Sequence, residues 1–133
     1  MIEGRCHCGA VRWTYRGTPD RATVCTCSVC RRYGAIWAYG DLDRDVTVAA
    51  APDAGGTYLT ADREIDFHHC RTCGCVTDWT STVPDGAGRS RIAVNLRLAD
   101  PASVAAIPLR RFDGADRWTE LPAEGHRVAD LLA

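Results

Sequence analysis

Alternating apolar and polar residues recur in short stretches of the chain and predict a mainly β fold. The clearest stretch is 92–98, where Ile92, Val94, Leu96 and Leu98 occupy alternate positions, as in a strand with one buried face. Further pieces have this period or a β-rich composition, at residues 10–16, 22–25, 46–48, 57–59, 64–70, 76–80, 110–113 and 115–121. Segments rich in Gly, Pro and Asp separate several of them, so we expect short strands joined by turns.

Helix signals are confined to the last third of the sequence. Asp100 and Pro101 match an N-cap followed by proline at the first helical position, which predicts a short helix through Ala106. Pro108 would end this helix, and the tail at 124–132 suits a second brief one. We find no repeat and no second domain, so the prediction is a single domain over residues 1–133 with one or two short helices.

Composition and charge exclude several classes of partner. The formal net charge of −1, with interleaved signs, provides no basic surface for nucleic acid or an anionic membrane. No apolar run approaches the roughly 20 residues of a membrane span, and the N-terminal residues lack the apolar core of a signal peptide. These features predict a cytoplasmic protein whose oligomeric state the sequence leaves open.

Eight cysteines are the dominant chemical feature of the chain. In a reducing compartment they suggest metal ligands rather than four disulfides. They fall into three groups along the sequence, namely Cys6 and Cys8; Cys25, Cys27 and Cys30; and Cys70, Cys73 and Cys75. Their spacings do not match the ferredoxin runs of iron–sulfur proteins, so zinc is the favoured metal.

The middle group places three thiols within six positions, from Cys25 to Cys30. On extended backbone Cys25 and Cys27 leave the same face, and a turn from Cys27 to Cys30 brings a third sulfur to the same point. Structural zinc is normally closed by four ligands, whereas catalytic zinc keeps three protein ligands and one exchangeable position. Whether a fourth protein ligand exists therefore separates a scaffold from an enzyme.

Spacing alone does not decide how the thiols are paired. A rubredoxin-like arrangement would join Cys27 and Cys30 to Cys70 and Cys73, but it leaves other thiols without a purpose. Pairing Cys6 and Cys8 with Cys70 and Cys73 instead closes one Cys₄ site and leaves the triplet as a separate, open site. We favour two sites, with zinc held by the residues Cys6, Cys8, Cys70 and Cys73 and by the residues Cys25, Cys27 and Cys30.

Neighbouring residues leave alternatives open. Cys75 could be either a small buried thiol or an additional ligand or redox partner for the triplet. His7, His68 and His69 are near the cysteines in sequence, although a histidine beside a metal site is more often not a ligand.

The segment that follows the triplet adds aromatic and basic side chains. Residues 31–40 are expected to form a loop and a strand that lay aromatic surface beside the metal, either as core or as pocket wall. Arg31 and Arg32 are candidates to attract the carboxylates of a thiol cofactor, against the commoner role of solvated surface charge.

Three linked motifs carry a family resemblance. They are Gly4-x-Cys6-x-Cys8-Gly9-Ala10-Val11, then Cys25-x-Cys27-Ser28-x-Cys30-Arg31, then Phe67-x-x-Cys70-x-x-Cys73-Gly74. Their order and spacing, over roughly Arg5 to Leu98, resemble the glutathione-dependent formaldehyde-activating (GFA) family, which also includes centromere protein V. The resemblance implies a β-tent fold with two zinc ions, structural at the four-cysteine set and catalytic at the triplet.

The activity implied by the resemblance is the reversible joining of formaldehyde and glutathione to S-(hydroxymethyl)glutathione, a carbon-sulfur lyase reaction. Cys75 departs from the Thr or Ser that often follows Cys-Gly in the family, and Trp37 and Trp79 suggest a reshaped pocket. The expectation is thus a zinc enzyme acting on a low-molecular-weight thiol and a small aldehyde. The alternatives are a non-catalytic two-zinc module, in which Cys75 or a histidine closes the second site, and a metal-free redox sensor.

Overall fold

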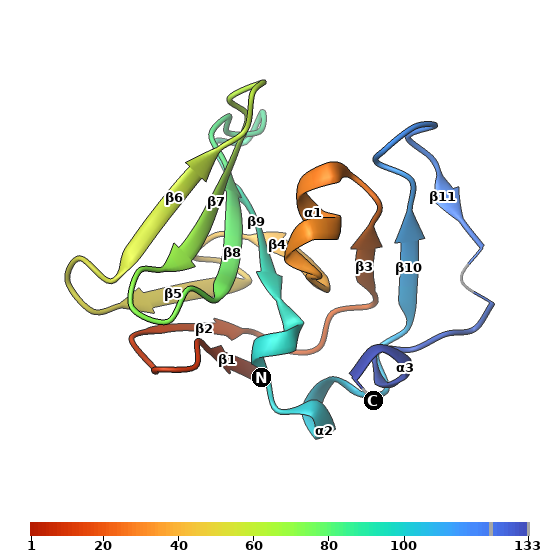
Figure 1. Cartoon of the computed structure of the whole chain (residues 1–133), viewed down its shortest axis with the longest axis horizontal. Coiled ribbons are helices and arrows are strands. Elements are labelled where there is room, and N and C mark those ends of the chain that lie inside the picture. Colours follow the sequence, from red (N-terminus) through yellow and green to blue (C-terminus); the bar gives the residue numbers. More distant parts are fainter. Residues whose placement is uncertain (123, 133) are drawn as a thin grey trace.

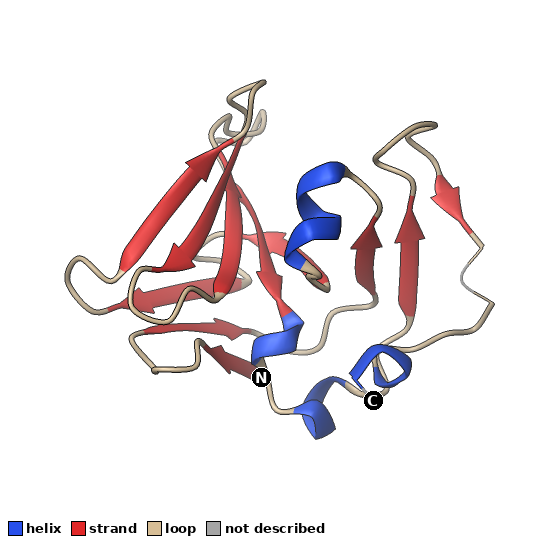
Figure 2. Ribbon diagram, viewed as in Figure 1, coloured by secondary structure: helices blue, strands red, loops and turns tan. Residues whose placement is uncertain are grey.

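The computed structural model describes residues 1–122 and 124–132, and these residues form strands far more than helices. The strands are β1 (Ile2–Arg5), β2 (Val11–Tyr15), β3 (Ala22–Cys25), β4 (Trp37–Asp41), β5 (Val46–Ala50), β6 (Gly55–Leu59), β7 (Ile65–Cys70), β8 (Val76–Ser81), β9 (Arg91–Asn95), β10 (Leu109–Phe112) and β11 (Glu120–Leu121). The helices are α1 (Ser28–Tyr33), α2 (Pro101–Val104) and α3 (Ala129–Leu132), with a 3₁₀ turn, η1, at Leu96–Leu98. This content confirms the predicted mainly β fold (Figure 2).

The strands form two sheets. One has three strands in the order β1-β2-β5, and the other has eight in the order β11-β10-β3-β4-β9-β8-β7-β6. Neighbouring strands are antiparallel except β3 and β10, which run parallel with Cys25 opposite Phe112. Figure 1 shows α1, in orange, in the opening between the β7–β9 part of the larger sheet and its β3–β10 part.

Three apolar clusters fill the interior. The largest joins the two sheets through Trp13, Ile36, Ile92 and Leu96, all nearly inaccessible to solvent. A second packs Cys30 of α1 against aromatic residues of the larger sheet, and a third surrounds Cys6 and Cys70. Burial of this apolar surface drives folding, and the second and third clusters include cysteines among their buried residues.

Several predicted elements are confirmed. The strands expected around residues 10–16, 22–25, 46–48, 57–59, 64–70, 76–80 and 110–113 are all present. Asp100 caps α2 by accepting a hydrogen bond from the backbone N–H of Ala102 at 2.9 Å. The tail helix is also present, although it is shorter than expected.

The strand predicted over 92–98 is wrong beyond Asn95. The Asn95 side chain accepts a hydrogen bond from the backbone N–H of Arg97 and caps η1, so the alternation of Leu96 and Leu98 continues through a turn rather than a strand. In the predicted extended piece 115–121, only Glu120–Leu121 is a strand. The first strand, β1, was not expected, because Ile2 is its one large apolar residue and no apolar period follows it through Arg5.

The prediction of a loop after Cys30 is wrong, because α1 runs through Tyr33. Cys27 is its N-cap, with Sγ accepting a hydrogen bond from the N–H of Cys30. Gly34 ends it in the left-handed conformation (φ 62°) and donates its N–H to the Cys30 carbonyl. None of the helices in the described residues is long and apolar enough to cross a membrane.

Candidate metal centres

Two turns bring four cysteines together between the sheets. Cys6 and Cys8 lie in the turn after β1, which Gly9 completes with a φ of 80°. Cys70 ends β7, and the turn through Cys73 closes with the Gly74 N–H donating to the Cys70 carbonyl at 2.8 Å. Because β1 belongs to the small sheet and β7 to the large one, this cluster ties the two sheets to each other.

The geometry of these four sulfurs fits a tetrahedral zinc ion. All four Sγ atoms lie within 4.8 Å of one another. The Cys6 and Cys8 sulfurs are 3.6 Å apart, and those of Cys8 and Cys70 are 3.5 Å apart. Sulfurs bound at zinc-thiolate distances in a tetrahedron are about 3.8 Å apart, so little movement is needed to bind the ion.

Backbone N–H groups favour thiolates in this cluster. The N–H of Val11 donates to the Cys6 sulfur at 3.3 Å. The N–H groups of Cys75 and Cys8 lower the pKa of Cys73 to about 5. The N–H of Cys73 likewise lowers the pKa of Cys70. Thiolates are the form that binds zinc.

The second cluster is the triplet, whose three sulfurs also lie within 4.8 Å of one another. Cys25 ends β3, Cys27 caps α1, and Cys30 lies in the first turn of that helix. The turn predicted from Cys27 to Cys30 is therefore helical, and it still brings the third sulfur to the other two. Among the described residues, no further Cys, His, Asp or Glu joins this group.

Each sulfur of the triplet accepts a hydrogen bond from an N–H donor. The backbone N–H of Cys27 lies 3.5 Å from the Cys25 sulfur, and that of Cys30 lies 3.4 Å from the Cys27 sulfur. The indole N–H of Trp37 lies 3.4 Å from the Cys30 sulfur. Hydrogen-bond donors to a sulfur stabilise its thiolate form, so the site suits a metal ion bound by the three thiolates.

With no metal bound, the triplet holds one acidic thiol. Hydrogen bonding from the Cys30 thiol, aided by the backbone N–H groups of Cys27 and Gly114, lowers the pKa of Cys25 to about 5. The same contact with Cys25, together with burial, raises the pKa of Cys30. A cation shared among the sulfurs would favour the thiolate form of all three.

The triplet lies at a cleft of about 370 Å³. Six aromatic side chains line it, from β4, β7, β8, β10 and the loop after β10: Trp37, Tyr39, Phe67, Trp79, Phe112 and Trp118. Its volume is near the lower end of the range for small-molecule sites. The expected aromatic surface therefore lies beside the three cysteines, with Trp37 and Trp79 both in the wall.

Two arginines bring positive charge to this cleft. The Arg91 guanidinium lies 4.8 Å from the centre of the Tyr39 ring and 5.8 Å from that of Trp79. Arg110 stacks over Phe112 at 4.8 Å, and its Nε lies 3.3 Å from the Glu120 carboxylate without the alignment of a hydrogen bond. Neither arginine was predicted, because only the pairing of distant strands brings β9 and β10 to the same cleft.

The structure also locates the residues whose roles the sequence left undecided. Cys75 packs with the cluster around Cys6 and Cys70, so it lies beside the four-cysteine site and not beside the triplet. Arg31 and Arg32 are exposed on the last turn of α1 and are not part of the cleft lining. The rubredoxin-like pairing is wrong, because Cys27 and Cys30 belong to a different cluster from Cys70 and Cys73.

The histidines do not join the triplet either. Nε2 of His68 is 2.9 Å from the Thr80 hydroxyl and 3.9 Å from the Asp78 carboxylate. Both His68 and His69 line a separate cavity of about 320 Å³. His7 lies in the turn between Cys6 and Cys8 and is exposed.

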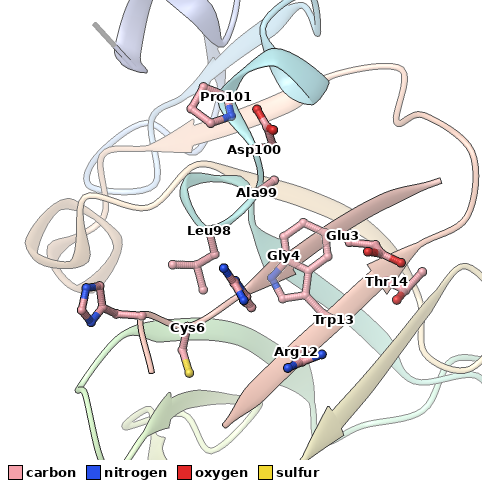
Figure 3. Close-up of a pocket in the computed structure, with 12 residues that line it drawn as sticks. Glu3, Gly4, Cys6, Arg12, Trp13, Thr14, Leu98, Ala99, Asp100 and Pro101 are labelled. Carbon is pink, nitrogen blue, oxygen red and sulfur yellow. The ribbon is translucent and has the colours of Figure 1, made fainter. Parts of the chain in front are cut away.

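A larger cavity, of about 740 Å³, lies between the β1–β2 hairpin and residues 98–101. Figure 3 shows the indole of Trp13 beside Gly4, where a β-carbon would lie 2.2 Å from the ring, so that only glycine fits. The one thiol in its lining, Cys6, belongs to the four-cysteine cluster. The cleft at the triplet is therefore the better candidate for chemistry.

Comparison with known proteins shows which family the chain belongs to. The family model described as glutathione-dependent formaldehyde-activating enzyme matches residues 1–105. The chain belongs to this family. A Rhodobacter sphaeroides protein of known crystal structure, a structural-genomics target, is 28% identical over 80% of this chain and 98% of that chain, with a TM-score of 0.61. No curated protein matches the chain.

The residues matched by the family model include both cysteine clusters but only part of the cleft lining. All seven cysteines of the two clusters lie within the matched residues. Arg110, Phe112 and Trp118 of the cleft lie after residue 105, beyond the match. One wall of the cleft thus lies outside the residues that the family model matches.

Proposed function

We propose that the chain is a zinc enzyme that joins a low-molecular-weight thiol to a small aldehyde, or cleaves the adduct, as a carbon-sulfur lyase of the S-(hydroxymethyl)glutathione synthase type. The observation that carries the proposal is a group of three cysteine sulfurs within 4.8 Å of one another that opens into a cleft. Glutathione and formaldehyde are the substrates that the family name suggests. Cytoplasmic location and a single domain accompany this proposal as predictions.

The two clusters divide the metal roles. Cys6, Cys8, Cys70 and Cys73 would hold a structural zinc, while Cys25, Cys27 and Cys30 would hold a catalytic one. Zinc at the triplet would supply a Lewis acid with a free position that takes up a thiol as thiolate. The N–H donors to the three cysteine sulfurs offset the negative charge that accumulates when another thiolate arrives.

The reaction itself forms one carbon–sulfur bond. The thiol sulfur adds to the aldehyde carbon, and the proton lost by the thiol ends on the former carbonyl oxygen. Aromatic side chains around the cleft exclude water from the sulfur and hold the aldehyde beside it. Arg91 and Arg110 attract the carboxylates of the thiol, and Arg31 and Arg32 would act from the outer surface at longer range.

The alternative of a non-catalytic zinc module requires a fourth protein ligand at the triplet. Cys75, the first candidate for that role, packs against the other cluster. The histidines nearest in sequence to the cysteines also lie outside the triplet group. These placements support the enzyme over the module.

Turnover by Cys27→Ser, compared with that of the zinc-loaded wild type, tests the proposal. Exchange between free aldehyde and thiol adduct, followed by NMR with glutathione and formaldehyde, is expected to fall at least 100-fold, since the variant lacks one of three ligands. Zinc retained at the four-cysteine site would show that the variant is folded. An unchanged exchange rate in a folded variant that has lost zinc from the triplet would refute the proposal.

A further inference from the structure

The cleft has a wall that the family match does not reach. This C-terminal wall consists of β10, the loop of residues 113–119 and β11, whereas the match ends at residue 105. It contributes Arg110, Phe112 and Trp118 to the cleft lining. Any selectivity that it confers is therefore not implied by the family match.

The C-terminal wall is attached directly to the triplet. β10 pairs with β3 so that Phe112 lies opposite Cys25. The backbone N–H of Thr26 donates to the Phe112 carbonyl at 3.0 Å, and the Thr26 hydroxyl donates to the Asp113 carboxylate at 3.1 Å. Because Thr26 separates Cys25 from Cys27, the wall and the metal ligands form one connected unit.

The loop of the wall is held in a defined shape. Asp113 donates its N–H to the Thr119 carbonyl and accepts the Trp118 N–H at its own carbonyl, both at 2.8 Å. Its carboxylate also accepts the backbone N–H groups of Asp116 and Arg117, each at 3.2 Å. These bonds fix the backbone of the loop that carries Trp118.

Trp118 presents a large apolar ring to solvent at the mouth of the cleft. The residue is 70% exposed, and its ring meets that of Phe112 edge to face with centroids 5.1 Å apart. Its φ of 57° lies in the left-handed region, which is unfavourable for a bulky residue. Exposed aromatic rings and strained backbone are both found at ligand sites, where a bound ligand covers the ring and stabilises the strained conformation.

The chemistry around Trp118 indicates the ligand. Arg110 lies over Phe112, and across the cleft Arg91 lies over Tyr39 and Trp79. Cations set among aromatic rings suit a ligand with a carboxylate next to a flat apolar group. Formaldehyde offers neither feature, so in the proposed reaction the thiol would carry these groups.

We infer that Trp118 is a specificity-determining residue that selects thiols carrying a flat apolar group beside a carboxylate. The inference rests on the proposed function, because it takes the thiol sulfur to bind at the triplet. Trp118 contacts the apolar group, and Arg91 binds the carboxylate. Arg110, which already faces the Glu120 carboxylate, adds positive charge nearby, and the loop of residues 113–119 carries the indole.

Two thiols of matched charge test the inference by calorimetric titration of the zinc-loaded full chain. The probes are 2-mercapto-3-phenylpropanoate and 2-mercaptopropanoate, which differ only in the phenyl group. We expect the wild type to bind the phenyl probe about tenfold more tightly, and Trp118→Ala to remove that preference while changing the affinity for 2-mercaptopropanoate less than twofold. Trp118→Phe should restore most of the preference.

A matched control and two contrary results complete the test. Tyr58→Ala removes another aromatic ring, 55% exposed and outside the cleft lining, and should leave both affinities unchanged. Equal affinities of the wild type for the two probes, or equal losses of both in Trp118→Ala, would overturn the inference alone. Binding of both probes by Cys27→Ser with wild-type affinity would overturn the inference together with the proposed function.

Discussion

The two cysteine clusters use the same ligand atom in unlike surroundings. The four-cysteine cluster is built from two tight turns, one from each sheet, and its Cys6 and Cys70 are inaccessible to solvent. The triplet is built on a strand end and a helix start, and it faces a cleft of about 370 Å³. The comparison teaches that the role of a cluster follows from ligand number and surroundings rather than from ligand type.

The largest contrast should appear in stability. Structural zinc contributes about 10 kcal/mol or more in small zinc domains, so Cys70→Ser is expected to lower the melting temperature by at least about 15 °C. Cys27→Ser, at the triplet, should lower it by less than about 5 °C while losing one zinc ion. Calorimetry and metal analysis of both purified variants check this difference, and equal losses of stability would show that the two sites share one structural role.

Gly114 provides a way to disturb the triplet without removing a ligand. A β-carbon there would lie 2.5 Å from the Cys25 sulfur, so Gly114→Ala must displace either the sulfur or the loop. We expect zinc affinity at the triplet to fall about 10- to 100-fold and affinity at the other cluster to stay constant, as measured by chelator competition.

Gly86→Ala is the matched control for Gly114, because nothing lies within 4 Å of the added carbon. Wild-type zinc affinity in Gly114→Ala would show that the loop yields without moving Cys25. The close contact would then play no part in shaping the site.

Much of the fold, and the grouping of seven cysteines into two clusters, could be predicted from the sequence. The clusters are found because the cysteine spacing is local, as in Cys25, Cys27 and Cys30, and because turns at Gly9 and Gly74 are encoded by residue type. Arg91 and Arg110 could not be found, because they reach the cleft only through the pairing of β9 with β4 and of β10 with β3. Helix α1 was missed because its N-cap is a cysteine rather than Ser, Thr, Asp or Asn.

A smaller effect is expected from the indole donor of the triplet. Trp37→Phe keeps an aromatic ring but removes the N–H that lies 3.4 Å from the Cys30 sulfur. A hydrogen bond to a charged group contributes about 1.5–3 kcal/mol, and the lower end of that range corresponds to a fall of roughly tenfold in zinc affinity at the triplet. Trp79→Phe, in the same cleft, serves as control, and equal zinc affinities of the two variants would exclude a role for the indole donor.

The smallest effect concerns thiol reactivity with no metal bound. The pKa of Cys25 is lowered to about 5, so this thiolate persists above pH 5 and is lost as the pH falls through that value. The pKa of Cys30 is raised, so Cys30 stays protonated over the same range. Iodoacetamide labelling followed by mass spectrometry between pH 4 and 8 should modify Cys25 before Cys30, whereas the reverse order would contradict this assignment.

The central claim is that one cluster is closed and the other open, and anomalous scattering at the zinc edge tests it most directly. Crystals of zinc-loaded protein grown with 3-mercaptopropanoate should give two anomalous peaks. One peak should be surrounded by the sulfurs of Cys6, Cys8, Cys70 and Cys73, and the other by those of Cys25, Cys27 and Cys30 with the sulfur of the added thiol. A protein side chain in that fourth position, or no zinc at the triplet, would contradict the account.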